Sequence, residues 1–137
     1  MKRLCAVAMA LVMTSGLCMG AVKWTHDYDK ALEQAKQEKK LLMVDVYTDW
    51  CGWCKKLDRD VYSNKAVEER LGKDFIAVKV NAEKDAKGPS LARKFGTHGY
   101  PHIVFVKADG AKIYEIGGYQ PVDDFLKSLD EAVKKAK

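Results

Sequence analysis

The chain has 137 residues, of which 47% are hydrophobic and 31% are charged, and this is the size and composition of one soluble globular domain with a full hydrophobic core. The formal net charge is +5, but the lysines are interspersed with acidic residues and form no basic block. We therefore expect a single domain that does not bind nucleic acid.

The first 20 residues have the pattern of a signal peptide. Lys2 and Arg3 precede an apolar run of about ten residues, which is too short to cross a bilayer comfortably. Small residues follow, and we expect cleavage after Gly20. Cleavage there leaves a mature domain of residues 21–137 with a net charge of about +3, exported to the periplasm or secreted.

Two alternatives for this segment stay open. Cys18 is a candidate for lipid modification in a lipoprotein, although the bulky Leu17 stands where a small residue is preferred. The segment is also a candidate for an uncleaved membrane anchor. If cleavage follows Gly20 instead, Cys51 and Cys54 are the two cysteines of the mature chain.

Apolar periodicity and turn residues predict alternating helices and strands over the rest of the chain. In chain order we expect a helix over residues 27–39, a buried strand over 41–46 that contains Asp45, a helix through Cys54, Leu57 and Val61, a helix from Ser63 or Asn64 that ends at Gly72, a strand over 75–80, a helix from Gly88 that ends at Gly96, a strand over 103–106, a strand over 112–116 and a helix from about Pro121 to Val133. This order predicts an α/β sheet with helices on both faces.

Cys51 and Cys54 lie between the expected central strand and the start of a helix. Unpaired backbone N–H groups and the positive end of the helix dipole favour a thiolate on Cys51. Cys54 lies about one helical turn further on, close enough to attack a mixed disulfide. A structural disulfide across so short a loop would stabilise the fold little, so the pair indicates redox chemistry.

Three separated motifs resemble the thioredoxin family, and the resemblance covers residues 24–137. The motifs are Val44-Asp45 leading to Trp50-Cys51-Gly52-Trp53-Cys54-Lys55, then Gly99-Tyr100-Pro101 before a strand, and Gly117-Gly118 after a hairpin. The resemblance implies a thioredoxin fold, with a central mixed β-sheet flanked by helices on both faces. Residues 56–67 are most similar to periplasmic thioredoxin-like reductases, including the C-terminal domain of the transmembrane thiol:disulfide interchange reductase.

The resemblance implies the roles of three catalytic residues. Cys51 matches the exposed nucleophile, Cys54 the buried resolving thiol, and Asp45 the buried acid that takes and returns the Cys54 proton. Burial should raise the Asp45 pKa, which suits that task. If Asp45 instead faces solvent from its strand, this role is lost. The implied activity is an exported thiol-disulfide oxidoreductase that reduces protein disulfides through a transient mixed disulfide.

Substrate binding is implied for five residues around the cysteines. Pro101 resembles the cis-proline that faces the disulfide, and the backbone at Tyr100 would pair with an extended substrate chain. Trp50, Gly52 and Trp53 would form an apolar docking surface. The alternative for the two tryptophans is that they only cover the core.

Four further polar residues are weaker candidates. Asp58 and Lys79 match positions that tune the thiols, although Asp58 is equally well explained as a surface acid and Lys79 is better explained as a solvated residue at a strand end. We expect His98 and His102 to be ordinary polar residues of a loop or strand, not metal ligands.

We expect no cofactor besides the Cys51–Cys54 disulfide. The expected partners are disulfide-containing proteins and a membrane thiol electron donor, and the protein is expected to be a monomer. Trp53 stands where thioredoxin has proline and strongly oxidising relatives have histidine, so the reduction potential and the direction of electron flow stay open. The alternatives are a copper-handling protein that uses both cysteines and a histidine, and a substrate-binding module with idle cysteines.

Overall fold

The structure is a computed structural model that describes residues 21–137, so the predicted signal peptide and Cys18 lie outside the described residues. Five strands and five helices follow in this order: β1 (Trp24–Thr25), α1 (Tyr28–Glu38), β2 (Leu41–Tyr47), α2 (Gly52–Asp60), α3 (Lys65–Asp74), β3 (Phe75–Asn81), α4 (Gly88–Phe95), β4 (His102–Val106), β5 (Lys112–Gly117) and α5 (Val122–Lys135). Among the residues described, no helix combines the length and apolar character needed to span a membrane.

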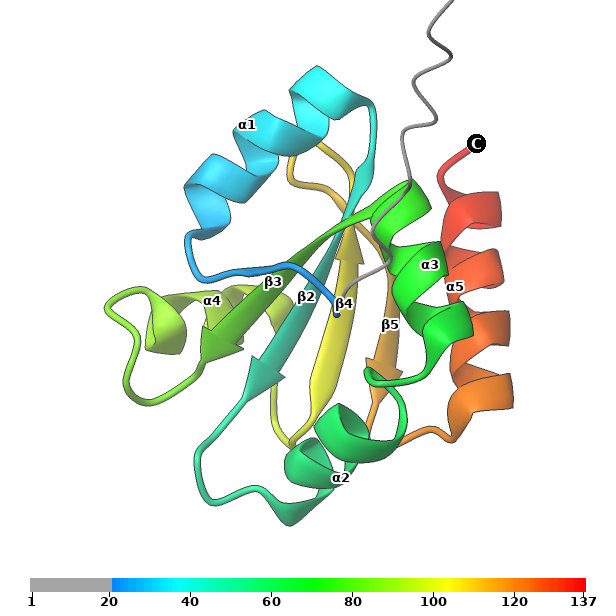
Figure 1. The fold of residues 1–137 in the computed structure, drawn as a ribbon. Helices are drawn as coiled ribbons and strands as arrows, with labels where there is room; N and C mark the ends of the chain where they lie inside the picture. The colour runs from blue at the N-terminus through cyan, green and yellow to red at the C-terminus, as the bar shows by residue number, and fades with distance from the viewer. Residues whose placement is uncertain (1–20) are drawn as a thin grey trace, which may run out of the picture.

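The strands form one mixed sheet in the order β1-β3-β2-β4-β5. β1, β3 and β2 run parallel to one another, whereas β4 is antiparallel to both β2 and β5. In Figure 1 the helices lie on the two sides of this sheet. α1 and α4 pack on one face, and α2, α3 and α5 pack on the other. The predicted α/β architecture with helices on both faces is confirmed.

β2 is the central strand, and residues 42–46 of it are fully buried. Apart from Asp45 these buried residues are all apolar, as expected for a strand that helices cover on both faces. Since alternate residues of a strand face the same side, Met43 and Asp45 both face the side covered by α2 and α3. Asp45 lies opposite Lys79 in β3, and opposite Ile103 in β4.

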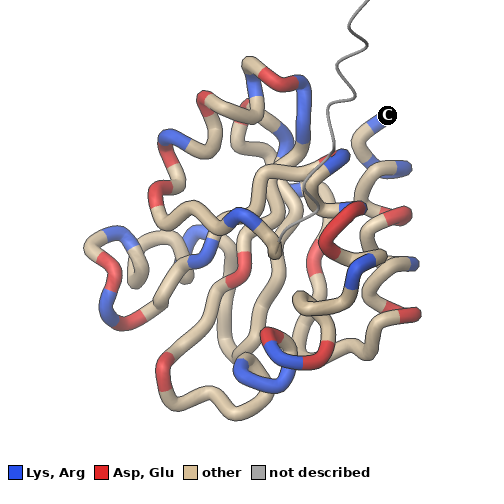
Figure 2. The backbone as a smooth tube through the Cα atoms, in the orientation of Figure 1, with Lys and Arg blue, Asp and Glu red and all other residues tan. Residues whose placement is uncertain are grey.

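Charged residues cover the outside of this fold without segregating by sign. In Figure 2 basic and acidic residues are mixed along the helices α1, α2, α3 and α5. Several of them pair locally, for example Lys36 with Glu33 and Lys127 with Asp124, both exposed and each 3.5 Å apart. Such exposed pairs contribute little to stability, and they agree with the solvated surface that the sequence predicts.

Two helix boundaries follow the predicted capping residues and one does not. Asp27 caps α1, accepting a hydrogen bond from the Lys30 N–H at 3.1 Å, and Gly96 ends α4 with a φ of 71°. The prediction that Gly72 ends α3 is wrong, because the helix continues to Asp74. Gly72 keeps a negative φ, and an ion pair between Arg70 and Asp74 at 2.6 Å joins the last helical turn.

Asn64 caps α3, and its removal should have a measurable cost. Its side-chain oxygen accepts hydrogen bonds from the N–H groups of Ala66 at 3.0 Å and Val67 at 3.4 Å. We expect Asn64→Ala to lower the free energy of unfolding by about 1 kcal/mol, measured by urea denaturation. Asn64→Asp keeps an acceptor and should stay close to wild type; an equal loss in both variants would contradict the capping role.

Candidate active site

Cys51 and Cys54 form a disulfide at the start of α2, with their Cα atoms 5.3 Å apart. Cys51 is the N-cap residue of this helix, and its Sγ accepts a hydrogen bond from the Cys54 N–H at 3.1 Å. The same N–H group and the helix dipole would stabilise a Cys51 thiolate in the reduced form. Cys51 is 4% exposed and Cys54 2%, so the expected contrast between an exposed and a buried cysteine is small in the disulfide form.

Asp45 lies in the interior with no exposed surface. Its Oδ2 accepts a hydrogen bond from Lys79 Nζ at 2.9 Å, and the same Nζ donates to Asp58 Oδ1 at 2.6 Å. Lys79 therefore links the central strand to α2. Asp58 lies four residues after Cys54, so the two side chains are on the same face of α2. This face of α2 is the one that meets the ion-pair network.

The expectation that Lys79 is solvated at a strand end is wrong, because the residue is only 8% exposed. β3 lies between β1 and β2, and every residue of β3 is buried. The ammonium group lies 4.9 Å from the ring centroids of Trp24 and Tyr47, and 5.2 Å from that of Tyr62. Cation–π attraction and two carboxylates thus replace the water that the ammonium group loses.

Burial and the neighbouring charges together determine the pKa values of Asp45 and Lys79. Burial raises the pKa of Asp45 above its ordinary value, although the positive charge and hydrogen bond of Lys79 act in the opposite direction. For Lys79 burial acts to lower the pKa, but the two neighbouring carboxylates outweigh it and the pKa is raised. Asp45 therefore holds a proton more readily than an exposed aspartate, beside an ammonium group that stays charged.

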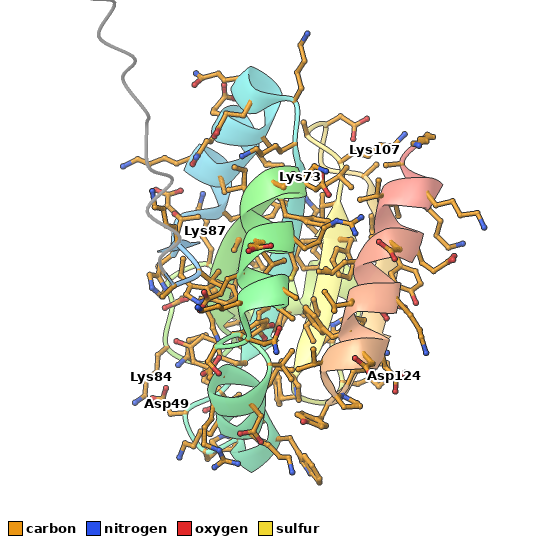
Figure 3. The ribbon with its side chains drawn as sticks, turned by 45° about the vertical axis from the view of Figure 1, so that its right-hand side comes forward. Asp49, Lys73, Lys84, Lys87, Lys107 and Asp124 are labelled. Atoms are coloured by element: carbon orange, nitrogen blue, oxygen red, sulfur yellow. A yellow bond between two sulfur atoms is a disulfide. The ribbon has the colours of Figure 1, made fainter. Side chains whose placement is uncertain are left out.

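Trp50 and Trp53 are 66% and 58% exposed, so the alternative that they only cover the core is wrong. The edge of Trp50 meets Tyr100, with ring centroids 5.7 Å apart, and its Nε1 donates a hydrogen bond to Glu83 Oε1 at 3.0 Å. Next to Trp50, Asp49 pairs with Lys84, and Figure 3 shows these two side chains together beside α2. The contacts of Trp50 with Glu83 and of Asp49 with Lys84 thus connect the turn before Cys51 to the loop that follows β3.

Trp53 lies beside Tyr119, with ring centroids 5.5 Å apart. Lys56 Nζ lies over both rings, 5.7 Å from Trp53 and 5.3 Å from Tyr119. Gly52, the first residue of α2, is exposed between the two tryptophans in the sequence. One aromatic pair, which contains Trp50, therefore precedes Cys51 in the chain, and a second pair contains Trp53, which lies between the two cysteines.

The Tyr100–Pro101 peptide bond is cis and directly precedes β4. The contact between Trp50 and Tyr100 places this loop beside the turn that carries Cys51. The Pro101 carbonyl accepts a hydrogen bond from the Gly118 N–H at 2.8 Å, which ties the loop to the end of β5. Gly118 has a φ of 101°, a conformation that favours glycine.

A family model of the thioredoxin-like domain matches residues 28–133. The chain belongs to the thioredoxin-like family. The Cys51–Cys54 disulfide lies within the residues that match this family of thiol-disulfide oxidoreductases. The resemblance in the sequence motifs and the predicted thioredoxin fold are both confirmed.

Individual thioredoxin-like relatives cover most of this chain. The thiol:disulfide interchange protein DsbD of Ralstonia nicotianae is 28% identical over 123 residues, which are 88% of this chain and 20% of that protein. The protein disulfide-isomerase TMX3 of Homo sapiens is 32% identical over 125 residues, 90% of this chain and 25% of that protein. A solution structure of a putative disulphide-isomerase from Bacteroides thetaiotaomicron has a TM-score of 0.73 and 32% identity, and covers 83% of this chain and 93% of that one. The chain thus spans about a fifth to a quarter of the length of these curated relatives.

His98 and His102 of this thioredoxin-like domain have hydrogen-bond partners within the protein. His98 Nδ1 lies 2.7 Å from the Gly96 carbonyl oxygen. His102 is buried, with Nδ1 2.7 Å from Thr97 Oγ1 and Nε2 2.9 Å from Glu115 Oε2. Over residues 21–137 no three His, Cys, Asp or Glu side chains come together in a way that could hold a metal ion. These contacts do not favour the copper-handling alternative.

Sequence reasoning missed two residues that border the redox centre. Tyr119 follows the Gly117-Gly118 motif, and Glu83 lies in the polar loop after β3. Both contact their tryptophan from a distant part of the chain, so no local pattern points to them. The position of Tyr119 directly after a family motif was the one available signal.

Proposed function

We propose that this protein is an exported oxidoreductase that reduces disulfides in other proteins. The observation that carries the proposal is the Cys51–Cys54 disulfide at the N-terminus of α2, where the Cys54 N–H points at Cys51 Sγ. A thiolate formed there is stabilised and positioned for attack on a disulfide. Export would use residues 1–20 as a cleaved signal peptide, and the domain would act as a monomer in the periplasm or outside the cell.

The proposed mechanism has two exchange steps. The Cys51 thiolate attacks a substrate disulfide, which forms a mixed disulfide and releases one substrate sulfur as a thiolate. Asp45 then accepts the Cys54 thiol proton, and the Cys54 thiolate attacks Cys51 Sγ. The Cys51–Cys54 disulfide forms, the second substrate sulfur leaves as a thiolate, and two electrons have moved from the dithiol to the substrate. The raised pKa of Asp45 and its position beneath α2 support this role.

Trp50, Gly52, Trp53, Tyr100 and Pro101 would bind the substrate chain. The exposure of both tryptophans and the contact of Trp50 with Tyr100 support this assignment. An extended substrate segment would pair with the backbone at Tyr100, and apolar side chains would pack on the aromatic pairs. A membrane thiol donor would return electrons to Cys51–Cys54, and similarity to thiol:disulfide interchange proteins supports this source.

The reduction potential of Cys51–Cys54 tests the proposed direction. It would be measured by equilibration in defined thiol buffers, with the fluorescence of the tryptophans as the signal. We expect a value near that of thioredoxin, about −270 mV, as a reductase with a dedicated electron supply requires. A value near about −120 mV would make the protein a donor of disulfides, and the absence of any reversible couple would overturn the oxidoreductase proposal.

A further inference from the structure

Lys56 lies on the aromatic surface beside the redox centre, and the proposed exchange steps do not use its charge. Its Nζ lies 5.7 Å from the ring centroid of Trp53 and 5.3 Å from that of Tyr119. Trp53 is largely exposed, and Tyr119 is partly exposed. The ammonium group is thus held over two rings, at the surface that a partner protein would cover in the mixed disulfide.

The Lys56 ammonium group forms no ion pair within residues 21–137. Asp60 lies one helical turn further on, but its two carboxylate oxygens accept hydrogen bonds from Arg59 at 2.8 and 3.2 Å. Cation–π attraction to the two rings therefore positions Lys56 where an ion pair does not. Its positive charge stays available to a carboxylate on another molecule.

The aromatic pair that contains Trp50 carries the opposite charge. Trp50 Nε1 donates its hydrogen bond to the Glu83 carboxylate at 3.0 Å, and the neighbouring Lys84 pairs with Asp49. A carboxylate on a partner is therefore attracted on the Trp53 side of the docking surface and repelled on the Trp50 side. The charges distinguish one kind of partner from another, which the apolar rings alone would not do.

We propose that Lys56 selects substrate proteins in which an acidic side chain lies next to the disulfide to be reduced. The proposal rests on the proposed function and deepens it by naming the class of substrate. In the mixed disulfide an Asp or Glu carboxylate of the substrate would pair with Lys56 Nζ, while apolar groups beside it pack on Trp53 and Tyr119.

Docking makes this ion pair stronger than an ordinary surface pair. The partner excludes water from the pair, and a cation that two rings already hold in position loses little side-chain freedom when the pair forms. A basic side chain of the substrate at the same place meets a like charge and is disfavoured. The preference between acidic and basic substrates is the sum of these two effects.

Three disulfide-linked peptide dimers test this selection. They are identical except that the residues on both sides of the cysteine are Glu, Gln or Lys, so that a charge reaches Lys56 in either chain direction. Excess peptide would oxidise the reduced protein, with tryptophan fluorescence following the closing of Cys51–Cys54. The rates at which dithiothreitol reduces the same peptides correct for the effect of the charges on the peptide disulfide itself. At low ionic strength we expect the corrected rate to be about fivefold higher with the Glu peptide than with the Lys peptide, and the ratio should approach one at high salt.

Variants of Lys56 show whether this side chain carries the preference. Lys56→Gln should bring the ratio of the Glu and Lys peptide rates close to one, Lys56→Glu should invert it, and Lys56→Arg should preserve it. Any effect of these changes on the reactivity of Cys51 applies to all three peptides and cancels in the ratio. Lys55→Gln is the matched control, because it removes the same charge from the neighbouring exposed position of α2 and should keep most of the wild-type ratio.

The outcomes separate the selection from the proposed function. Equal corrected rates for the three peptides with the wild-type protein would overturn the selection and leave the proposed function standing. A ratio that Lys56→Gln leaves unchanged, or that Lys55→Gln lowers as much, would also overturn the selection, because the preference would then come from the general charge of the surface. A wild-type protein that none of the peptides oxidises would overturn the proposed function together with the selection. The rate with the uncharged Gln peptide shows that each variant is folded and active.

Discussion

Cys54→Ser is expected to hold the protein on its substrate as a mixed disulfide, and Cys51→Ser is expected to abolish disulfide reduction altogether. Cys51 Sγ sits at the N-terminus of α2, where the helix favours a thiolate, and a serine hydroxyl stays protonated there at neutral pH. Cys54 is the one thiol positioned to attack the mixed disulfide from the same helical turn. Without it the first exchange step proceeds and the second does not.

An aromatic disulfide that releases a coloured thiolate measures both variants. Cys54→Ser should release one equivalent of thiolate quickly and retain the other half of the reagent, visible by mass spectrometry. Cys51→Ser should react only at the rate of an ordinary buried thiol, because Cys54 is 2% exposed. Stable adducts on Cys54 in place of Cys51 would reverse the assigned roles.

Lys79→Met is expected to lower the free energy of unfolding by about 3–5 kcal/mol at neutral pH, because it leaves the buried Asp45 carboxylate without a cation. Burial already raises the pKa of Asp45, and loss of the Lys79 charge raises it further. The folded protein then binds a proton that the unfolded chain releases above about pH 3.9. Stability must therefore fall as the pH rises from there through the folded pKa, so the loss should be largest at pH 8 and smaller at pH 5.

Urea denaturation at these two pH values tests this result. The double variant Asp45→Asn/Lys79→Met removes both charges and should recover most of the loss. Lys84→Met is the matched control, since Lys84 pairs with Asp49 on the surface and its removal should change the free energy of unfolding little. A loss for Lys79→Met that is independent of pH, or no larger than for Lys84→Met, would contradict the charge-pair explanation.

The parts of the fold that depend on local sequence patterns were predictable. The apolar run of β2, the caps Asp27 and Gly96 and the order of strands and helices all follow from residues close together in the chain. Gly72 was misjudged because glycine is tolerated inside a helix when the next turn is stabilised elsewhere, here by Arg70 and Asp74. The two-residue strand β1 is too short to produce any periodic signal.

The ion-pair network could not be predicted from local sequence patterns, because its members are far apart in the chain. Lys79 meets Asp45 because β3 pairs with β2 in parallel in a register that places these residues side by side. A lone lysine in one apolar strand and a lone aspartate in another were the available signal, and they become informative only when the pairing is known. The third member, Asp58, was visible as a position on α2 but its contact with Lys79 was not.

The site combines a rigid part on β2, which is paired with a strand on each side, and an adaptable part formed by the exposed tryptophans. β2 pairs with β3 along its whole length and with β4 along most of it, so its amide hydrogens can exchange with solvent only when the middle of the sheet opens. Asp45 therefore keeps its position through any local fluctuation of the surface. Trp50 and Trp53, which stand out into solvent, can adjust to partners of different shape. Under the proposed mechanism, the surface that binds partners can therefore adapt while Asp45 stays fixed on the central strand.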